Sequence, residues 1–167
     1  MGRVRVKRPI RVDGEMAYIP LTRGYEAVID LCDIPIADGR NWWAQVDSCN
    51  VYAVSLEAGK PVRLHREILH VGEGMVVDHK DGDGLNNRRD NLREATAHQN
   101  QRNQKKRKDN TSGKKGAYFH KIVGRYAAQI AVNGVQRHVG YFDTIDEAHA
   151  AYCEASKKYH GEFGRSE

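Results

Sequence analysis

The sequence predicts an α+β protein in which a small amino-terminal antiparallel sheet leads into a compact core, followed by a three-stranded antiparallel sheet packed on one helix. Three observations predict this fold. Short apolar runs with β-like character fill the first 60 residues, an Asp- and Gly-rich loop separates a strand from a helix near residue 90, and a hairpin signal precedes an amphipathic segment near the carboxyl end. The 167 residues suffice for one domain or two small ones.

The amino-terminal sheet is predicted from the runs MAYIPLTRG, YEAVIDLCD, WWAQVD and NVYAVSLE, which Gly, Asp and Pro separate. Its core is expected to hold Trp42, Trp43, Tyr52 and Val54, because adjacent bulky residues in a short sheet pack one on each face. The stretch RLHREILH that follows is predicted as a short helix or a strand-to-helix passage. Its two histidines, His65 and His70, are expected in packing or surface positions, with substrate contact as the alternative.

The central segment is predicted as strand, loop and helix. MVVDH forms the strand, and the residues DGDG after it form turns by bonding their own backbone. A helix is expected to open near Asp90 as its N-cap and to include Ala95, Thr96 and Asn100. A frame of this kind is compact enough to hold a metal site.

Three further strands and a helix are predicted near the carboxyl end. The strands are GAYFHKI, GRYAAQIAV and QRHVGYF, and Asn133-Gly134 joins the last two as a hairpin. Thr144 and Glu147 form a capping box at the start of the helix, which Gly161 ends. In the middle strand Tyr126, Ala128, Ile130 and Val132 are expected to face the helix, which leaves the face of Arg125 and Gln129 free.

The positive charge is concentrated between the two sheets. The chain carries a net charge of +5, and residues 101–116 alone hold seven basic side chains against one acidic one. This stretch has almost no apolar residues, so it is predicted to be a linker, with a merely solvated spacer as the alternative to phosphate contact. Its basic residues are Arg102, Lys105, Lys106, Arg107, Lys108, Lys114 and Lys115.

Several classes of protein are excluded by composition. No run of 18 apolar residues exists and the start, MGRVRVKRPI, lacks the apolar core of a signal peptide, so we expect neither a membrane span nor secretion. Cys32, Cys49 and Cys153 are widely spaced and odd in number, which argues against a disulfide framework or a thiolate zinc site. They are expected to be reduced packing residues.

The side chains best suited to chemistry lie around the central loop. A histidine beside a carboxylate at a strand end, as in Asp78-His79, suits phosphodiester hydrolysis, since the imidazole can take a proton from water while its neighbour holds a cation. Ligation by Asp and Asn oxygens favours Mg²⁺ or Mn²⁺ over zinc. The same stretch contains the further polar residues Asn86, Asn87, Asp90, Asn91 and Asn100.

The string VDHKDGDGLNNRRDNLREATAHQN resembles the HNH nuclease motif of phage and intron-encoded homing endonucleases, which is built on the ββα-metal (His-Me finger) fold. The resemblance covers residues 62–103 closely and extends upstream through IPLTRGYEAVIDLCD and LHREIL. It implies that His79 is the general base, that Asn91 holds the loop so that His79 stays in position, and that Asp78 and Asn100 are metal ligands. Many members have His at the last position, so His98 and Asn103 remain alternatives to Asn100.

The stretch from 113 to 164 resembles the plant Apetala-type/ethylene-response-factor DNA-binding domain in the phrases GRYAAQI, HVGYFDTIDEAHAAY and YHGEF. The resemblance implies that the free face of the sheet lies in the major groove of DNA, with a small protein-interaction domain as the alternative. Arg and Gln can pair with base edges, and Lys suits phosphate. The expected contacts in this module are Tyr118, His120, Lys121, Arg125, Gln129, Arg137 and His138.

Together these features predict a nuclease half over residues 1–103, a basic linker over 104–113 and a DNA-binding domain over 114–167. The expected activity is metal-dependent hydrolysis of double-stranded DNA, with Mg²⁺ or Mn²⁺ as cofactor. A sequence-specific regulator with an inactive nuclease core is the main alternative, and an RNA nuclease is another. We expect a phage-encoded protein of the bacterial cytoplasm, either monomer or homodimer.

Overall fold

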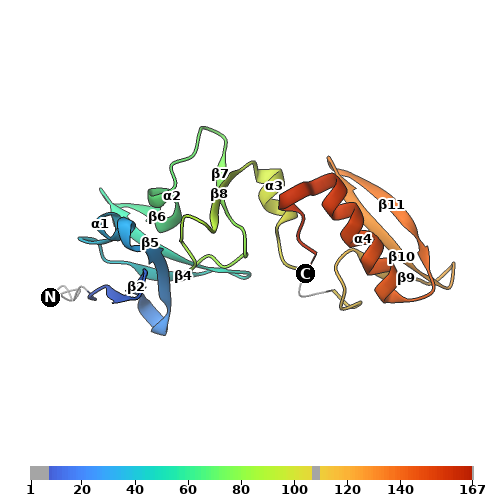
Figure 1. The fold of residues 1–167 in the computed structure, drawn as a ribbon, viewed down its shortest axis with the longest axis horizontal. Coiled ribbons are helices and arrows are strands. Elements are labelled where there is room, and N and C mark those ends of the chain that lie inside the picture. The colour runs from blue at the N-terminus through green and yellow to red at the C-terminus, as the bar shows by residue number, and fades with distance from the viewer. Residues whose placement is uncertain (1–7, 107–109, 167) are drawn as a thin grey trace. The chain divides into compact units, whose positions relative to one another are not determined.

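The computed structural model describes residues 8–106 and 110–166, and these form two compact units that divide between Ala97 and His98 (Figure 1). Each unit has its own hydrophobic core. The prediction of a mixed α and β protein with small antiparallel sheets is confirmed. Part of the expected linker, residues 107–109, lies outside the described residues, and with it Arg107 and Lys108.

In the first unit the described strands form three small antiparallel sheets, ordered β1-β2-β3, β4-β5-β6 and β7-β8. The strands are β1 (Arg11–Asp13), β2 (Met16–Pro20), β3 (Glu26–Asp30), β4 (Trp43–Val46), β5 (Val51–Glu57), β6 (Lys60–Arg63), β7 (Val76–His79) and β8 (Leu92–Ala95). The helical segments are the 3-10 turns η1 (Thr22–Gly24) and η2 (Leu31–Asp33) and the short helices α1 (Ile34–Ala37) and α2 (Leu64–Ile68).

The core of the first unit joins these sheets. Ile29 of β3 and Leu64 of α2 are fully buried in it, and Val77 of β7 packs in the same cluster. Trp42 is buried as expected, and its indole Nε1 donates to the carbonyl of Ala37 at 2.9 Å. The strand that carries the proposed catalytic residues is therefore tied to the amino-terminal sheet by a shared core.

The helix expected to open at Asp90 begins seven residues later. Leu92–Ala95 form β8, which pairs antiparallel with β7 so that Asp78 lies opposite Arg93 and His79 opposite Leu92. The reason is pairing: the whole segment from Leu92 to Ala95 pairs with β7 as a strand, and Leu92 and Ala95 are buried in that arrangement. The helix itself is α3 (Ala97–Arg102).

The second unit consists of a three-stranded sheet, ordered β11-β10-β9, and a long helix that lies along one of its faces (Figure 1). Asn133 and Gly134 both have positive φ in the turn between β10 and β11, as a two-residue hairpin requires. The predicted capping box of Thr144 and Glu147 is present. The elements are β9 (Ala117–His120), β10 (Arg125–Val132), β11 (Val135–Phe142), α4 (Ile145–His160) and η3 (Gly161–Phe163).

The two faces of this sheet differ as predicted. Ala128, Ile130 and Val132 pack with Ala148 and Tyr152 of α4, and Tyr126 borders the same cluster. A bulge in β11 between the partners of Ala128 and Gln129 shifts the register there. The opposite face has no helix on it among the described elements.

Within the described residues no helix is long and apolar enough to cross a membrane. All three cysteines are free thiols, but Cys32 and Cys49 are exposed, so the expectation that the cysteines pack in the interior is wrong for these two. Cys32 lies in η2 and Cys49 in the bend between β4 and β5, both at the surface of the first unit. Cys153 of α4 is half-buried beside the core of the second unit.

Candidate active site

His79 ends β7 in a buried position, with 5% of its surface exposed. Its Nε2 lies 3.3 Å from Oδ1 of Asn87, whose Nδ2 donates to the carbonyl of Leu85 at 2.9 Å. Because that second bond assigns the amide, Oδ1 is an acceptor facing the ring, and Nε2 must carry the proton. The lone pair of His79 is therefore on Nδ1, the atom able to accept a proton.

Two further rings pack against His79. The ring of His65 meets it edge to face at a centroid distance of 5.0 Å, and Tyr52 lies at 6.1 Å. Burial lowers the pKa of His79, while the Asn87 hydrogen bond and nearby Asp81, Asp78 and Asp83 raise it in part. The net direction is downward, so the imidazole is neutral near pH 7, as a general base must be.

Asp78, the predicted metal ligand, is 2% exposed and pairs with Arg93 across the β7-β8 ladder. Both Nε and Nη2 of Arg93 approach the same carboxylate oxygen, Oδ2, at 2.8 Å. A carboxylate offers about four lone-pair sites, so this pairing is compatible with a metal contact. Arg93 was not singled out from the sequence, although its place opposite Asp78 follows once β8 is recognised as a strand.

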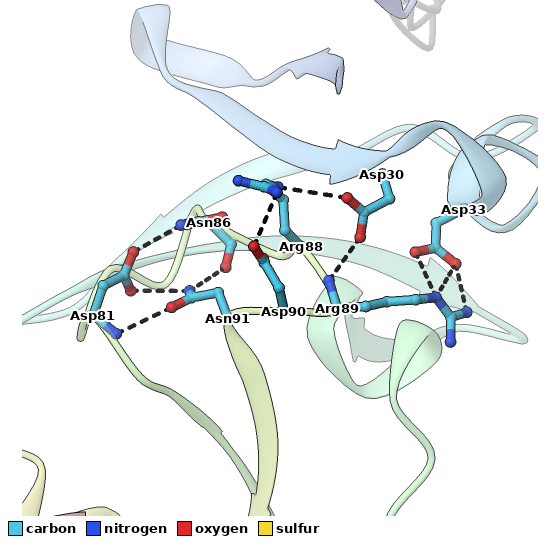
Figure 2. A network of polar contacts seen from close by, with 8 residues as sticks. All are labelled: Asp30, Asp33, Asp81, Asn86, Arg88, Arg89, Asp90 and Asn91. Carbon is cyan, nitrogen blue, oxygen red and sulfur yellow. Dashed lines mark hydrogen bonds and ion pairs between the residues drawn. The ribbon is translucent and has the colours of Figure 1, made fainter. Parts of the chain in front are cut away.

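Asn91 joins the two ends of the loop between β7 and β8. Its Nδ2 donates to Asp81 Oδ1 at 2.9 Å and to the Asn86 carbonyl at 2.8 Å, and its Oδ1 accepts from the Asp81 amide at 3.1 Å (Figure 2). Burial raises the pKa of Asp81, but hydrogen bonds from the Asp83 amide, Asn86 and Asn91 outweigh it and lower the pKa overall. The loop is thus closed around an ionised carboxylate.

The loop also contacts the amino-terminal sheet. Residues 85–87 run parallel to β3, where the Val28 amide donates to the Leu85 carbonyl and the Asn87 amide donates to the Val28 carbonyl, both at 2.8 Å. Gly84 lies so close to β5 that a Cβ there would overlap the Val51 carbonyl and the Tyr52 ring. Asn87 is fully buried as a result of this packing.

The second predicted metal ligand lies on α3. Asn100 is half-buried there, His98 is exposed and Asn103 is buried just beyond the helix. All three belong to the second unit and Asp78 to the first, so the choice among them stays a prediction. Among the described residues no group of three or more His, Cys, Asp or Glu side chains gathers as a metal site. The oxygen donors present fit a hard divalent cation by type.

The free face of the second sheet brings together most of the residues predicted to contact DNA there. Gln129 of β10 lies opposite His138, and Ala127 lies between Tyr118 and Tyr141. The rings on this face touch in a row: Tyr118 with His120 at 6.3 Å, His120 with Tyr141 at 5.5 Å, and Tyr141 with His138 at 4.4 Å. Tyr141 was not singled out from the sequence, but the strand register places it here.

Three basic residues of the predicted set lie elsewhere or are engaged. Arg137 pairs with Ile130 and so lies on the face toward α4, its guanidinium 5.7 Å from the Tyr159 ring. Arg125 pairs with Asp143 at 2.9 Å. Lys121 is exposed in the turn after β9.

The basic stretch is partly built into the second unit. Lys115 Nζ donates to the carbonyls of Arg102 and Gln104 at the end of α3, and burial, with Arg165 nearby, lowers its pKa to about 8. Lys114 pairs with Asp146 at 3.0 Å. Lys106 donates to the Gly113 carbonyl and Lys105 is exposed. The Arg102 guanidinium donates to the side chain of Asn133.

Comparison with known proteins gives matches over both units. A family model described as HNH endonuclease matches residues 68–102. A protein of Acanthamoeba polyphaga mimivirus named "Uncharacterized HNH endonuclease L560" is 33% identical over 148 residues, which cover 84% of this chain and 74% of that protein. "Protein 3.8" of Escherichia phage T7 is 33% identical over 95 residues, 57% of this chain and 78% of that protein. No solved structure matches at a comparable level.

Proposed function

The chain belongs to the HNH endonuclease family, and from that premise we propose that it is a metal-dependent DNA endonuclease of the homing type. The observation that carries the proposal is His79, a buried neutral imidazole whose Nε2 is held by Asn87 and whose neighbour is Asp78. Hydrolysis of a phosphodiester needs a base for water and stabilisation of the charge that develops on the phosphate. These side chains supply the base and one ligand for a cation.

In the proposed reaction, a water molecule gives a proton to Nδ1 of His79 while its oxygen bonds to phosphorus and the bond from phosphorus to the leaving sugar oxygen breaks. The Asn87 hydrogen bond at Nε2 keeps the ring in the tautomer that exposes the Nδ1 lone pair and stabilises the imidazolium that results. A divalent cation, Mg²⁺ or Mn²⁺, bound by Asp78 and Asn100 would stabilise negative charge on the phosphate and the leaving oxygen. Asn91 holds the loop closed beside this site.

The second unit is proposed to bind double-stranded DNA through the free face of its sheet. Gln129 and His138 lie side by side there and have the donors and acceptors to reach base edges. Lys105 and Lys106, which are exposed in the basic stretch, would contact phosphates. The viral origin of both relatives supports a phage-encoded protein.

The nuclease proposal is tested by incubating supercoiled plasmid and genomic DNA with the protein and Mg²⁺ or Mn²⁺, with and without chelator. We expect nicked or linear product only with metal, and none with His79→Ala, whose DNA affinity should stay near wild type because the ring is buried. His70→Ala is the matched control, since it removes an exposed histidine of the same unit. Full cleavage by His79→Ala would contradict the assignment.

The same assay separates the alternatives. A regulator with an inactive core would bind DNA without cutting it, and an RNA nuclease would be competed more strongly by RNA than by duplex DNA. Replacing Asn100, His98 and Asn103 singly by Ala identifies the second ligand as the variant that needs the most metal for half-maximal cleavage.

The targeting proposal is tested on the free face of the sheet. Gln129→Ala should relax sequence preference and cost about 1–3 kcal/mol of binding free energy at the preferred site, measured by footprinting and titration on a set of duplexes. Val135→Ala, an exposed change on the face toward α4, is the control. An unchanged footprint with Gln129→Ala would refute a reading role for this face.

A further inference from the structure

The amino-terminal sheet reaches the proposed active site through two carboxylates. Resting on the proposed role of His79, we propose that Asp30 and Asp33 are positioning residues of the nuclease site, which hold Arg88 and Arg89 so that Asn87 fixes the His79 ring. These carboxylates lie well upstream of residues 68–102, the part that the family model covers. The proposal therefore gives β3 and η2, which hold none of the proposed catalytic residues, a part in positioning the general base.

The pairing of Asp33 with Arg89 is the strongest of these contacts. Asp33 is fully buried, and the guanidinium approaches it in three ways: Nε to Oδ1 at 3.1 Å, Nε to Oδ2 at 3.0 Å and Nη2 to Oδ1 at 2.6 Å (Figure 2). A two-oxygen contact of this kind fixes direction as well as distance. A buried carboxylate also needs its cation, because an unpaired charge there costs several kcal/mol. Arg89 is therefore held in one place.

Asp30 holds the adjacent backbone. Its Oδ2 accepts from the Arg89 amide at 2.8 Å, and its Oδ1 lies 3.5 Å from Nε of Arg88, which also pairs with Asp90 at 2.9 Å (Figure 2). One carboxylate thus binds both the main chain and a side chain of the loop. The two contacts together restrict rotation of residues 88–89 more than either contact would alone.

These anchors reach Asn87 through the main chain. It lies next to Arg88 in the sequence, and its own amide donates to the Val28 carbonyl of β3, two residues before Asp30. Three points of β3 and η2 therefore hold residues 87–89: one main-chain bond and two carboxylates. With its backbone held in this way, the Asn87 side chain is oriented by the bond from its Nδ2 to the Leu85 carbonyl at 2.9 Å, and its Oδ1 lies 3.3 Å from Nε2 of His79.

The proposal implies that the cleavage rate depends on the position and orientation of the His79 ring. Displacing a catalytic base by about 1 Å can lower the rate about a hundredfold, whereas DNA binding through other residues is little affected. Loosening the anchors should therefore lower the turnover rate and leave DNA affinity almost unchanged. A merely structural role would instead lower stability alone.

Three variants test this in the full-length protein. Asp30→Ala removes the acceptor of the Arg89 amide, and Arg88→Gln removes a partly exposed cation. Asp33→Asn with Arg89→Gln removes both charges of that pair, so that no unpaired carboxylate is left buried. The control is Arg40→Gln. Arg40 joins Glu57 and Glu67 at 2.6 and 2.7 Å in the same unit, a comparable ion cluster that does not touch the loop.

The readouts are single-turnover cleavage rate, DNA affinity, thermal stability and the long-range ¹H–¹⁵N spectrum of the histidine rings, in which His79→Ala assigns the His79 signals. We expect Asp30→Ala and the double variant to slow cleavage about tenfold or more, with affinity within about twofold, and to mix the two tautomers of His79. Arg40→Gln should lose stability yet keep the rate and the His79 signals.

Wild-type His79 signals and rate in the folded anchor variants would overturn the proposal, as would a rate loss matched by an equal loss in Arg40→Gln. If the wild-type protein does not cleave DNA, the proposed function fails, but the ring spectrum still decides whether the anchors position His79. Arg88→Gln keeps the test valid if the buried double variant does not fold, because Arg88 is partly exposed.

Discussion

At the scale of single residues, the proposed site depends on two histidines that burial keeps neutral. His65 is 4% exposed, and burial, followed by the charges of His79, Arg63 and Arg66, lowers its pKa to about 3. In the unfolded chain His65 has the ordinary pKa of 6.5, so below that pH the unfolded chain binds a proton there and the folded protein does not. The contribution of the neutral His65 to the free energy of unfolding is therefore fully present above pH 6.5, and it is lost as the pH drops toward 3.

We expect the free energy of unfolding of the first unit to decrease by about 2 kcal/mol between pH 7 and pH 5 through His65 alone. In His65→Phe, which keeps a ring against Tyr52 but cannot titrate, the decrease should be smaller by that amount. Urea titrations at the two pH values measure it. The lowered pKa of His79 acts in the same direction, so some decrease remains in the variant. An equal decrease in the free energy of unfolding in both proteins would show that His65 can be protonated in the folded state.

The sequence singles out the residues for which a chemical role is predicted more readily than the residues that hold them in place. Asp78, His79 and Asn91 stand out because their types and spacing are unusual, and they lie together in the structure. The supporting roles cannot be predicted before the partners are known, as is the case for Asn87, Arg93, Asp30 and Asp33. Those partners are up to 59 residues away in the sequence, a distance that no local pattern reveals.

At the scale of elements, local signals predicted the second unit well because its contacts are close in sequence. The Asn-Gly turn, the capping box and the alternation along β10 each act within a few residues. In the first unit the sequence predicts a helix over residues 92–95, since Asp90 is a good N-cap and Leu-Arg-Glu-Ala has high helix propensity. Pairing with β7 and burial of Leu92 outweigh that propensity.

A glycine shows how tightly α4 packs on its sheet. Gly116 has a φ of +74°, and a Cβ there would overlap the ring of Tyr152, which is buried in the core of the second unit. Gly116→Ala should therefore destabilise this unit by about 2–4 kcal/mol, from the strained backbone and the overlap together. Gly124→Ala is the matched control, with a φ of +72° and no atom near its Cβ, and should cost about 1 kcal/mol. Similar losses in urea unfolding would mean that the helix can move away.

At the scale of the whole molecule, the net charge of +5 arises from a stretch whose lysines are not equivalent. Lys105 is exposed, whereas the ammonium of Lys115 is half-buried and engaged by two carbonyls. A phosphate contact by an exposed lysine releases a counterion and makes binding depend on salt. The structure therefore separates the stretch into residues available to DNA and a residue that stabilises the end of α3.

We expect Lys105→Ala to reduce the slope of log affinity against log salt by about 0.9. Lys115→Ala should change the slope less and lower the melting temperature more, because it leaves the carbonyls at the end of α3 without their donor. Affinity titrations between about 50 and 200 mM salt measure the slopes. Equal effects of the two substitutions would contradict the distinction.

The anchoring of the loop by β3 and η2 also has a consequence for the order of folding. Arg89 and Asp33 are 56 residues apart, so their contact closes a long loop. The conformational entropy of that loop is lost before the contact can stabilise the fold. The strands and helix of the second unit are neighbours in sequence and carry no such cost. A full-length chain that refolds therefore completes the sheet of the second unit quickly, and the proposed hydrolytic centre assembles last. Pulse-labelled amide exchange should show protection in β10 before the Arg89 amide.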